Sequence, residues 1–330
     1  MLNGKRMRAA ILAERGLPGK EVLAGRGLWG RMRRNDARAR GRLRGRMMGW
    51  IFILSGFVGC QQSFRSDSPP GYNLNVPKKY IMGDALHEIS GIAILKGKGD
   101  SLYAIEDEEG KLFFFHPGDS RADFVKFGKK GDYEDVAILG NKEFVVLRSD
   151  GSLFVFPIGM LKNMVRDSVR EYENILPAGE YEGLYGDDGG RLIALCKNCK
   201  ADDQRDEVSG YVLKDMNNKL AVTEHFKVDV STVKLDSGGK RRGGKNNGKF
   251  HPSCIARHPL TREWYIISSV NKVLLVLDEQ MKVKGVYPLD PGLFKQPEGL
   301  AFDAKGNMYI SNEGGQGNAN VLLFSYRQPK

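Results

Sequence analysis

The sequence is poor in the residues and motifs that carry zinc binding or serine-based hydrolysis. It has four cysteines and five histidines among 330 residues. Cys196 and Cys199 form one CxxC, but no second CxxC and no HxxxH supplies the two further ligands of a zinc site. The Gly-x-Ser-x-Gly turn and the ligand spacing of an EF-hand are also absent. The CxxC is therefore expected to be a local disulfide or a pair of thiols.

Excess charge is absent from most of the chain. The net charge is +11, and residues 1–46 hold 14 basic and three acidic side chains, which accounts for all of it. The remaining chain has 37 basic and 37 acidic residues. A basic face spread over the whole fold is thereby excluded, and we expect no nucleic-acid partner. The alternative, nucleic-acid binding by an Arg-rich arm, requires that residues 1–46 persist in the mature protein.

The N-terminal region has the pattern of an export signal. Arg-rich sequence is followed by the apolar run Trp50–Val58, which is too short to cross a bilayer as a helix, and then by Gly59 and Cys60. This resembles a bacterial lipoprotein box, which implies lipidation of Cys60. A mitochondrial-type presequence or a genuine basic arm are the alternatives.

The export interpretation divides the chain into four parts. Residues 1–46 are a leader outside the mature protein, with translation starting at Met47 or nearby. Residues 47–59 are the signal peptide, 60–77 a polar tether and 78–330 the folded domain. The protein is then expected in the bacterial cell envelope, held by a lipid anchor on the inner or outer membrane.

The folded part contains a repeated unit. A short strand of small and apolar residues recurs after an acidic residue or a serine, with steps of 44, 48, 71 and 45 residues. Each unit continues with two further strand-like segments that alternate in polarity and are rich in β-branched and aromatic residues. The second segments are predicted at Leu102–Glu106, Phe144–Arg148, Leu192–Cys196, Trp264–Ser268 and Met308–Ser311. The third segments are predicted at Leu112–Phe115, Leu153–Phe156, Gly210–Leu213, Val273–Leu277 and Val321–Phe324.

Units of about 45 residues with four strands are typical of a β-propeller. We predict an all-β, five-bladed propeller of four-stranded blades. The last unit has room for only three strands, so the segment Lys79–Leu86 is expected to close it and remove the open edges. Six blades is the alternative if the 71-residue step hides a degenerate blade. A short helix is expected within Met160–Glu173.

The ordered set of repeat motifs resembles the SdiA-regulated family, which is similar to NHL-repeat proteins. The motifs span about residues 78 to 330, and they are listed here: His87–Ala93, Tyr133–Ala137, Tyr181–Leu184, His251–Ser253, Gln296–Asp303 and Tyr309–Gly314. The resemblance implies a five-bladed propeller with bound calcium and an activity that is not established. Cys254 stands where a glycine is usual in the family.

The repeat alignment also predicts a site. Equivalent positions of the blades lie on a ring around the propeller axis, so the residue before each inner strand faces one mouth of the channel. These residues are Ser90, Glu134, Glu182, Ser253 and Glu298. Oxygen ligands without His or Cys suit Ca²⁺ or Mg²⁺, so the ring predicts a divalent-cation site, and the resemblance implies that its ion is calcium. Glu88 is expected to join the ligands, with Asn312 beside the ring. The alternative is that the acids are solvated or pair with Arg148 or similar residues.

Two functions remain open at this point. One is a binding or scaffold module for a protein or small-molecule ligand. The other is a metal-dependent hydrolase, phosphodiesterase-like or lactonase-like, that uses the axial cation. His251 and His87 are the candidate catalytic residues because each precedes an inner strand beside the ring. The alternative for both is a packing or capping role.

Overall fold

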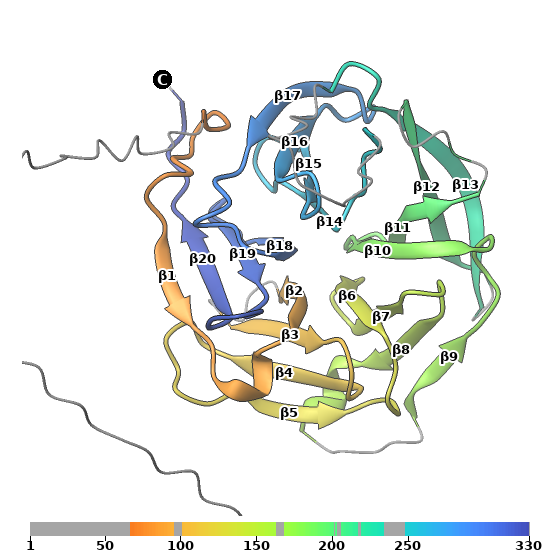
Figure 1. Ribbon diagram of the computed structural model, residues 1–330. Coiled ribbons are helices and arrows are strands. Elements are labelled where there is room, and N and C mark those ends of the chain that lie inside the picture. Colours follow the sequence, from red (N-terminus) through yellow and green to blue (C-terminus); the bar gives the residue numbers. More distant parts are fainter. Residues whose placement is uncertain are drawn as a thin grey trace, which may run out of the picture. The chain divides into compact units, whose positions relative to one another are not determined.

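A computed structural model describes the structure of residues 67–95, 101–162, 168–200, 202, 206–216, 219–233 and 248–329. Within these residues, the strands form five antiparallel sheets of four strands each. The sheets are arranged around a central axis as the blades of a β-propeller (Figure 1). The prediction of five blades is confirmed. The alternative of six is wrong, because the 71-residue step belongs to a single blade with long third and fourth strands.

Each blade has its first strand at the axis and its last at the rim (Figure 1). The inner strands are β2 (Ile89–Ile94), β6 (Tyr133–Leu139), β10 (Gly179–Gly186), β14 (Cys254–Arg257) and β18 (Pro297–Phe302). The second strands are β3 (Leu102–Glu106), β7 (Glu143–Arg148), β11 (Arg191–Cys199), β15 (Trp264–Ser268) and β19 (Met308–Asn312). Blades 1 to 5 are numbered in the order of these inner strands.

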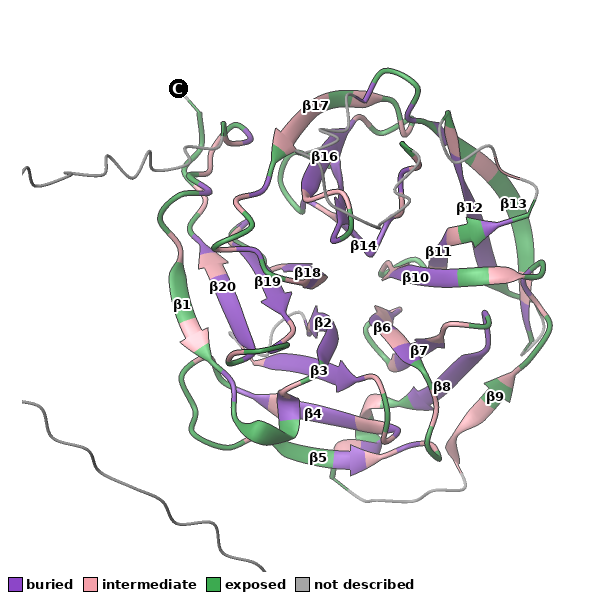
Figure 2. Cartoon of the chain, in the orientation of Figure 1, coloured by how far each residue is buried: buried purple, intermediate pink, exposed green. Residues whose placement is uncertain are grey.

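The outer half of each blade is more exposed than the inner half (Figure 2). The third strands are β4 (Lys111–Phe115), β8 (Leu153–Pro157), β12 (Glu207–Asp215), β16 (Val273–Leu277) and β20 (Asn320–Phe324). The outermost strands are β5 (Asp123–Lys126), β9 (Arg170–Tyr172), β13 (Leu220–Asp229), β17 (Val283–Pro288) and β1 (Lys78–Ile81). This gradient follows from the sequence pattern. The inner three strands of each blade are nearly all apolar, whereas apolar and polar residues alternate in the outermost strand.

Strand β1 closes the ring as predicted. It pairs antiparallel with β20, with Lys78 opposite Leu323 and Ile81 opposite Asn320. Blade 5 is therefore built from both ends of the folded part of the chain. Since every blade then has four strands, no blade is left with an unpaired third strand.

Five apolar clusters hold the blades together, one at each interface between neighbouring blades. The interface of blades 1 and 2, for example, contains Tyr103, Phe144 and Phe156, and the ring centroids of Tyr103 and Phe144 lie 4.9 Å apart. Successive side chains of a strand point to opposite faces of the blade, so they pack alternately into the interfaces with the two neighbouring blades. The core is thus a ring of five packed layers around the axis.

The short helix expected within Met160–Glu173 falls largely on residues 163–167, which lie outside the described residues. The described residues of this stretch hold the end of a 3₁₀ helix, η2 (Ile158–Leu161), and strand β9. The second 3₁₀ helix is η1 (Asp84–Leu86). A three-residue strand completes blade 2 because its backbone groups find partners on β8.

The tether predicted over residues 60–77 is shorter than expected. Leu74 is 1% exposed and packs in the cluster between blades 4 and 5. The hydroxyl of Tyr72 donates a hydrogen bond of 2.5 Å to the carbonyl of Gly306. The segment from Tyr72 to Leu74 is therefore part of the propeller, because it buries two large side chains that the polar composition of the segment concealed.

The predicted leader, signal peptide and lipidation site at Cys60 lie outside the described residues. Among the residues that the structure describes, no helix has the length and apolar character needed to cross a bilayer.

Candidate functional site

The inner strands give the channel two chemically different ends. The ring residues predicted from the sequence lie at the end of the channel where the inner strands begin. At the end where they finish, a pocket opens that is lined from the third residue of the repeat motif onward, for example from Ile92 in blade 1 and Val136 in blade 2. We call the first end the acid mouth and the second the channel pocket.

Two glycines, Gly91 and Gly299, lie in the inner strands between these two ends. A Cβ on Gly91 would lie 2.2 Å from Oδ1 of Asp135, and one on Gly299 would lie 2.7 Å from the carbonyl oxygen of Ser90. At this level, directly after the ring position, the inner strands of blades 1 and 5 therefore have no room for a side chain, whereas Asp135 and Cys254 occupy the same position in blades 2 and 4. Glycine in blades 1 and 5 lets their inner strands approach their neighbours closely.

One ammonium pairs with a ring carboxylate of the acid mouth and acts electrostatically on two others. Lys197 forms an ion pair with Glu182, whose side chain is 9% exposed. Burial raises the pKa of both Glu134 and Glu298, and the charge of the same ammonium opposes these shifts. Glu134, Glu182, Glu298 and Lys197 come from three blades, and they are the residues that make up the acid mouth. The sequence analysis assigned the possible counter-charge to Arg148, which instead pairs with Asp150, Glu171 and Glu173.

The buried carboxyl groups of the mouth have raised pKa values. The pKa of Glu134 is raised to about 8, chiefly by burial and then by the charge of Asp132, while the charge of Lys197 opposes the shift. Burial also raises the pKa of Glu298, although hydrogen bonds with Ser269 and Ser253 oppose the shift. Glu134 therefore holds a proton at neutral pH, because burial disfavours its charged form.

A disulfide positions the ammonium. Lys197 lies in β11 between Cys196 and Cys199, which are joined by a disulfide with their Cα atoms 5.8 Å apart. The pairing of β10 with β11 is irregular around Tyr181, opposite this segment. A Cβ on Gly179 would lie 2.9 Å from both sulfur atoms, so glycine is needed there. The disulfide that the sequence left open is formed, and it fixes the strand segment that carries Lys197.

The two ring serines, Ser90 and Ser253, form hydrogen bonds with neighbouring strands, and one of them also contacts a ring carboxylate. Ser253 is 3% exposed, and its Oγ accepts a hydrogen bond of 3.3 Å from the backbone N–H of Ser269. The carbonyl of Ser90 accepts a hydrogen bond of 2.7 Å from Ser311 Oγ. The two serines thus link inner strands to second strands, and Ser253 also contacts Glu298.

A second group of acids adjoins the mouth near blades 5 and 1. The pKa of Asp107 is raised to about 6 by burial and by the charges of Glu88, Glu106 and Glu313. Burial and the charge of Glu88 likewise raise the pKa of Glu313. Glu88 therefore lies among acids, but the neighbours that it affects are Asp107 and Glu313 rather than the three ring glutamates.

Two buried oxygens near these strands lack a hydrogen-bond partner within the described chain. They are Oδ1 of Asp107 and Oδ1 of Asn312. Asn312 is fully buried at the end of β19, and its Nδ2 donates a hydrogen bond of 3.2 Å to Asn320. The predicted ring neighbour Asn312 thus has one half of its amide paired with the third strand of its own blade.

Asp135, next to the ring, is a structural carboxylate. Its Oδ1 accepts a hydrogen bond of 2.8 Å from the backbone N–H of Val136, and its Oδ2 one of 2.7 Å from that of Leu184. Burial raises the pKa of Asp135 well above its ordinary value, while these two backbone donors oppose that shift. The side chain links the inner strands of blades 2 and 3 and leaves little capacity for another ligand.

The described residues do not form a preassembled calcium cage. No group of three or more His, Cys, Asp or Glu side chains among them is close enough to hold a metal ion. The oxygens of Asp135 are taken by backbone donors, and Glu182 is paired with Lys197. Calcium at this mouth remains a prediction, and a bound ion would have to displace the ammonium of Lys197.

Both candidate catalytic histidines hold backbone carbonyls. Nδ1 of His251 lies 3.3 Å from the carbonyl oxygen of Lys197, and Nε2 of His87 lies 3.1 Å from that of Gly317. Because a carbonyl only accepts, each of these ring nitrogens is the donor. Burial lowers the pKa of His251, which keeps its ring neutral at physiological pH. Both contacts fit the packing role that the sequence analysis kept as the alternative.

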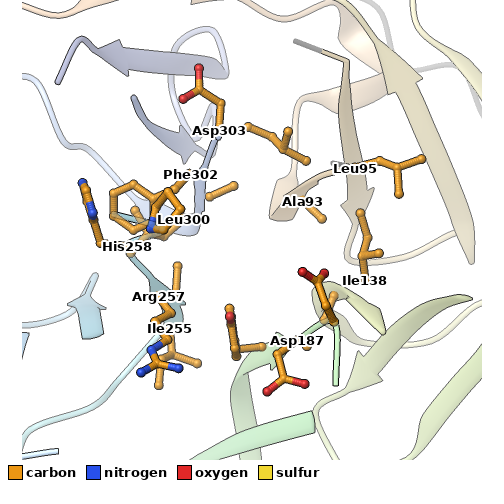
Figure 3. A pocket seen from close by; sticks show the side chains of 18 of the residues that line it. Ala93, Leu95, Ile138, Asp187, Ile255, Arg257, His258, Leu300, Phe302 and Asp303 are labelled. Carbon is orange, nitrogen blue, oxygen red and sulfur yellow. The ribbon is translucent and has the colours of Figure 1, made fainter. Parts of the chain in front are cut away.

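The channel pocket at the other end has a volume of about 420 Å³. Figure 3 shows side chains from different inner strands around one open space, namely Ala93, Ile138, Ile255 and Leu300. Charged residues at and just after the ends of the inner strands stand around this space, among them Asp187, Arg257 and Asp303. This pocket was not predicted from the sequence. A signal for it was the alanine that recurs one residue after the first apolar residue of the inner strands, as in Ile92 followed by Ala93.

No protein-family model matches the chain, and no curated protein matches it either. Solved structures are similar to it over most of its length. A luciferin-regenerating enzyme has 9% identity and a TM-score of 0.46, covering 76% of this chain and 95% of that one. Glutaminyl cyclase of Myxococcus xanthus has 13% identity and a TM-score of 0.48, with 76% and 96% covered. The WD40 β-propeller domain of Doa1 has 10% identity and a TM-score of 0.40, with 70% and 62% covered. At such low similarity no activity transfers, so the functional argument rests on the residues of this chain.

Proposed function

We propose that the protein is a binding module of the bacterial cell envelope whose acid mouth takes a cationic ligand. The observation that carries this proposal is that Lys197 pairs with Glu182 while its charge also acts on Glu134 and Glu298. The pKa of Glu134 is raised to about 8, chiefly by burial and then by neighbouring acidic charges. A cation that enters the mouth favours the ionised form of Glu134, and this attraction contributes to its binding free energy.

Calcium and organic cations are the two sources of this chemistry. Calcium is the ion that the sequence predicts, and its oxygen preference matches carboxylates and serine hydroxyls. An alkylammonium is the group that the mouth already accepts in Lys197. The proposal is for a binding or scaffold role, and it includes no chemical step.

Thermal unfolding of the full chain at pH 7.5 tests this proposal, with calcium, magnesium or spermidine added separately. A ligand at about 100 times its Kd stabilises by about 2.7 kcal/mol, a rise of several degrees in Tm for a domain of this size. We expect this rise with one of these cations and its loss in the Glu134→Gln, Glu182→Gln double variant. Glu224→Gln, at an exposed carboxylate of β13, is the matched control. If no cation changes the Tm of the parent protein, the proposal is wrong.

The same titration identifies the source. A response to calcium that is not matched by spermidine assigns the mouth to the metal ion, and the reverse assigns it to an ammonium group. Removing the internal competitor by Lys197→Met is expected to strengthen either response. The three test cations therefore establish the class of cation without knowledge of the natural ligand.

The export part of the proposal rests on residues 47–60, whose pattern resembles a bacterial lipoprotein signal. We propose a mature chain that starts at a lipid-modified Cys60 and anchors the propeller to a membrane. Intact-mass measurement of protein extracted from membranes is the test. A diacylated or triacylated chain starting at Cys60 is the expected result. A chain that retains residues 1–46 without lipid contradicts it.

A further inference from the structure

The channel pocket lies at the opposite end of the inner strands from the acid mouth. Its wall begins with one apolar residue from each blade, namely Ile92, Val136, Leu184, Ile255 and Leu300. The following position is alanine in four blades, at Ala93, Ala137, Ala256 and Ala301, and tyrosine in the other. Small side chains at this level leave the channel open, and a volume of about 420 Å³ is within the range of small-molecule sites.

The charges around the pocket are already committed to partners within the protein. Both carboxylate oxygens of Asp187 accept from Arg191, at 2.9 Å from its backbone N–H and 3.2 Å from Nε. Oδ1 of Asp303 accepts from the backbone N–H of Asn307 and its Oδ2 from Nδ2 of the same residue, at 2.9 and 2.7 Å. These acids stabilise the turns after their inner strands and do not point to a cationic ligand.

The basic residues of the rim are committed in the same way. The guanidinium of Arg257 donates 3.1 Å to Glu279 and 3.0 Å to the carbonyl of Arg262, and it stacks 5.1 Å from the centre of the Trp264 ring. Arg262 also donates to Glu279, at 3.0 Å. An anionic ligand would have to compete with Glu279 for both arginines, so the rim does not favour an anion.

The backbone adds hydrogen-bonding groups to the pocket, beside lining side chains such as those of Asn141 and Tyr185. Each inner strand is the first of its sheet and pairs with one neighbour only, so its other edge faces the axis. Such an edge presents backbone N–H and C=O groups that pair with nothing inside the blade. The pocket therefore combines apolar side chains with neutral donors and acceptors.

We propose that the channel pocket binds a neutral small molecule with an apolar body and a few hydrogen-bonding groups. The apolar ring at the base supplies most of the binding free energy through the burial of apolar surface. The strand edges orient the molecule. This site is independent of the acid mouth and of the cation proposed there, since it lies at the opposite end of the channel.

Two fluorescent probes that differ only in charge test the site and the ligand class. N-phenyl-1-naphthylamine is neutral, and 8-anilinonaphthalene-1-sulfonate carries a sulfonate on the same ring system. With the full chain at neutral pH, we expect the neutral probe to bind at one site per protein and at least about tenfold more tightly than the sulfonate, because desolvating an uncompensated charge opposes binding. Equal or tighter binding of the sulfonate would overturn the ligand class.

Pocket-filling variants locate the bound probe. Ile138→Trp and Ile94→Trp, made separately, place a larger ring in the pocket from two different blades at side chains that are partly exposed. We expect each to weaken binding of the neutral probe at least about tenfold, since the ring occupies the volume the probe needs. Ile81→Trp, on the rim strand β1 where Ile81 is 50% exposed, is the matched control and leaves binding unchanged.

The outcomes separate the site from other apolar surfaces. The Tm of each variant shows whether it is folded, and two filling positions keep the test available if one does not fold. Binding of the neutral probe that both folded variants retain would overturn the assignment to this pocket. Failure of the neutral probe to bind the parent protein at all would overturn the site itself.

Discussion

At the scale of single residues, Lys197 decides the character of the acid mouth. It is the one described cation that both pairs with a ring glutamate and acts on the other two. A repeat alignment does not reveal it, because Lys197 stands on a second strand and has no counterpart at equivalent positions of the other blades. The carboxylates were predictable from their repetition, whereas their counter-charge was not.

Lys197→Met tests the role of this counter-charge. It removes the partner of Glu182, whose side chain is 9% exposed, and leaves a carboxylate without compensation. We expect a loss of about 2 kcal/mol in the free energy of unfolding at pH 7.5, measured by urea denaturation.

Lys214→Met is the control for this prediction. Lys214 pairs with Glu224 at 3.2 Å, but both side chains are about half exposed. Exposed pairs contribute about 0.5 kcal/mol, so the control should change stability little. Equal losses in the two variants would contradict a special role for Lys197.

At the scale of elements, the inner strands depend on glycine where they converge. Gly91→Ala places a Cβ 2.2 Å from Oδ1 of Asp135 and 2.5 Å from its Cα. Because the Cα belongs to the neighbouring strand, the clash is relieved only by moving backbone, and we expect a loss of about 2–3 kcal/mol in urea denaturation. Gly159→Ala, where nothing lies within 4 Å of the added atom, is the control and should be close to neutral.

The segment before β1 is a second element whose contribution can be measured. Leu74 is fully buried between blades 4 and 5, although it lies in a stretch whose composition resembles a tether. Leu74→Ala is expected to cost about 3 kcal/mol, from lost apolar burial and a residual cavity. Val76→Ala, at a side chain that is 73% exposed, should have little effect in the same thermal or urea unfolding measurement.

At the scale of the whole molecule, the buried acids make stability depend on pH. The pKa of Glu134 is raised from an ordinary 4.5 to about 8, chiefly by burial, and that of Asp107 from 3.8 to about 6, again chiefly by burial. Between the unfolded and folded values, the native state binds more protons than the unfolded state. The free energy of unfolding therefore falls as the pH rises through this window.

We expect the Tm to decrease from pH 5 to pH 8.5 in the absence of added cations. Glu134→Gln removes a carboxyl group whose pKa is raised to about 8 and should flatten the upper part of this decrease, between about pH 6 and pH 8. Thermal unfolding at a series of pH values checks this. A Tm that rises over the same interval would contradict the electrostatic account of the acid mouth.

The local pattern of the sequence was sufficient for the architecture. Alternation and repeat spacing placed strands at Leu102–Glu106, Trp264–Ser268 and Val273–Leu277, and the structure has the same bounds. They also predicted five blades and the closing role of the first strand. These features follow from periodic burial, because each repeat buries the same faces and equivalent residues meet at one axis.

Only the tertiary structure decided what those residues face. It placed the ammonium of Lys197 among the ring carboxylates, gave both oxygens of Asp135 to backbone donors and packed Leu74 into the core. It also opened a pocket at the far end of the channel. Such contacts join residues from different blades, and their energies depend on burial and on distances across the axis. A sequence read along one chain determines which side chains repeat, while charge compensation and empty volume arise only when the blades are assembled.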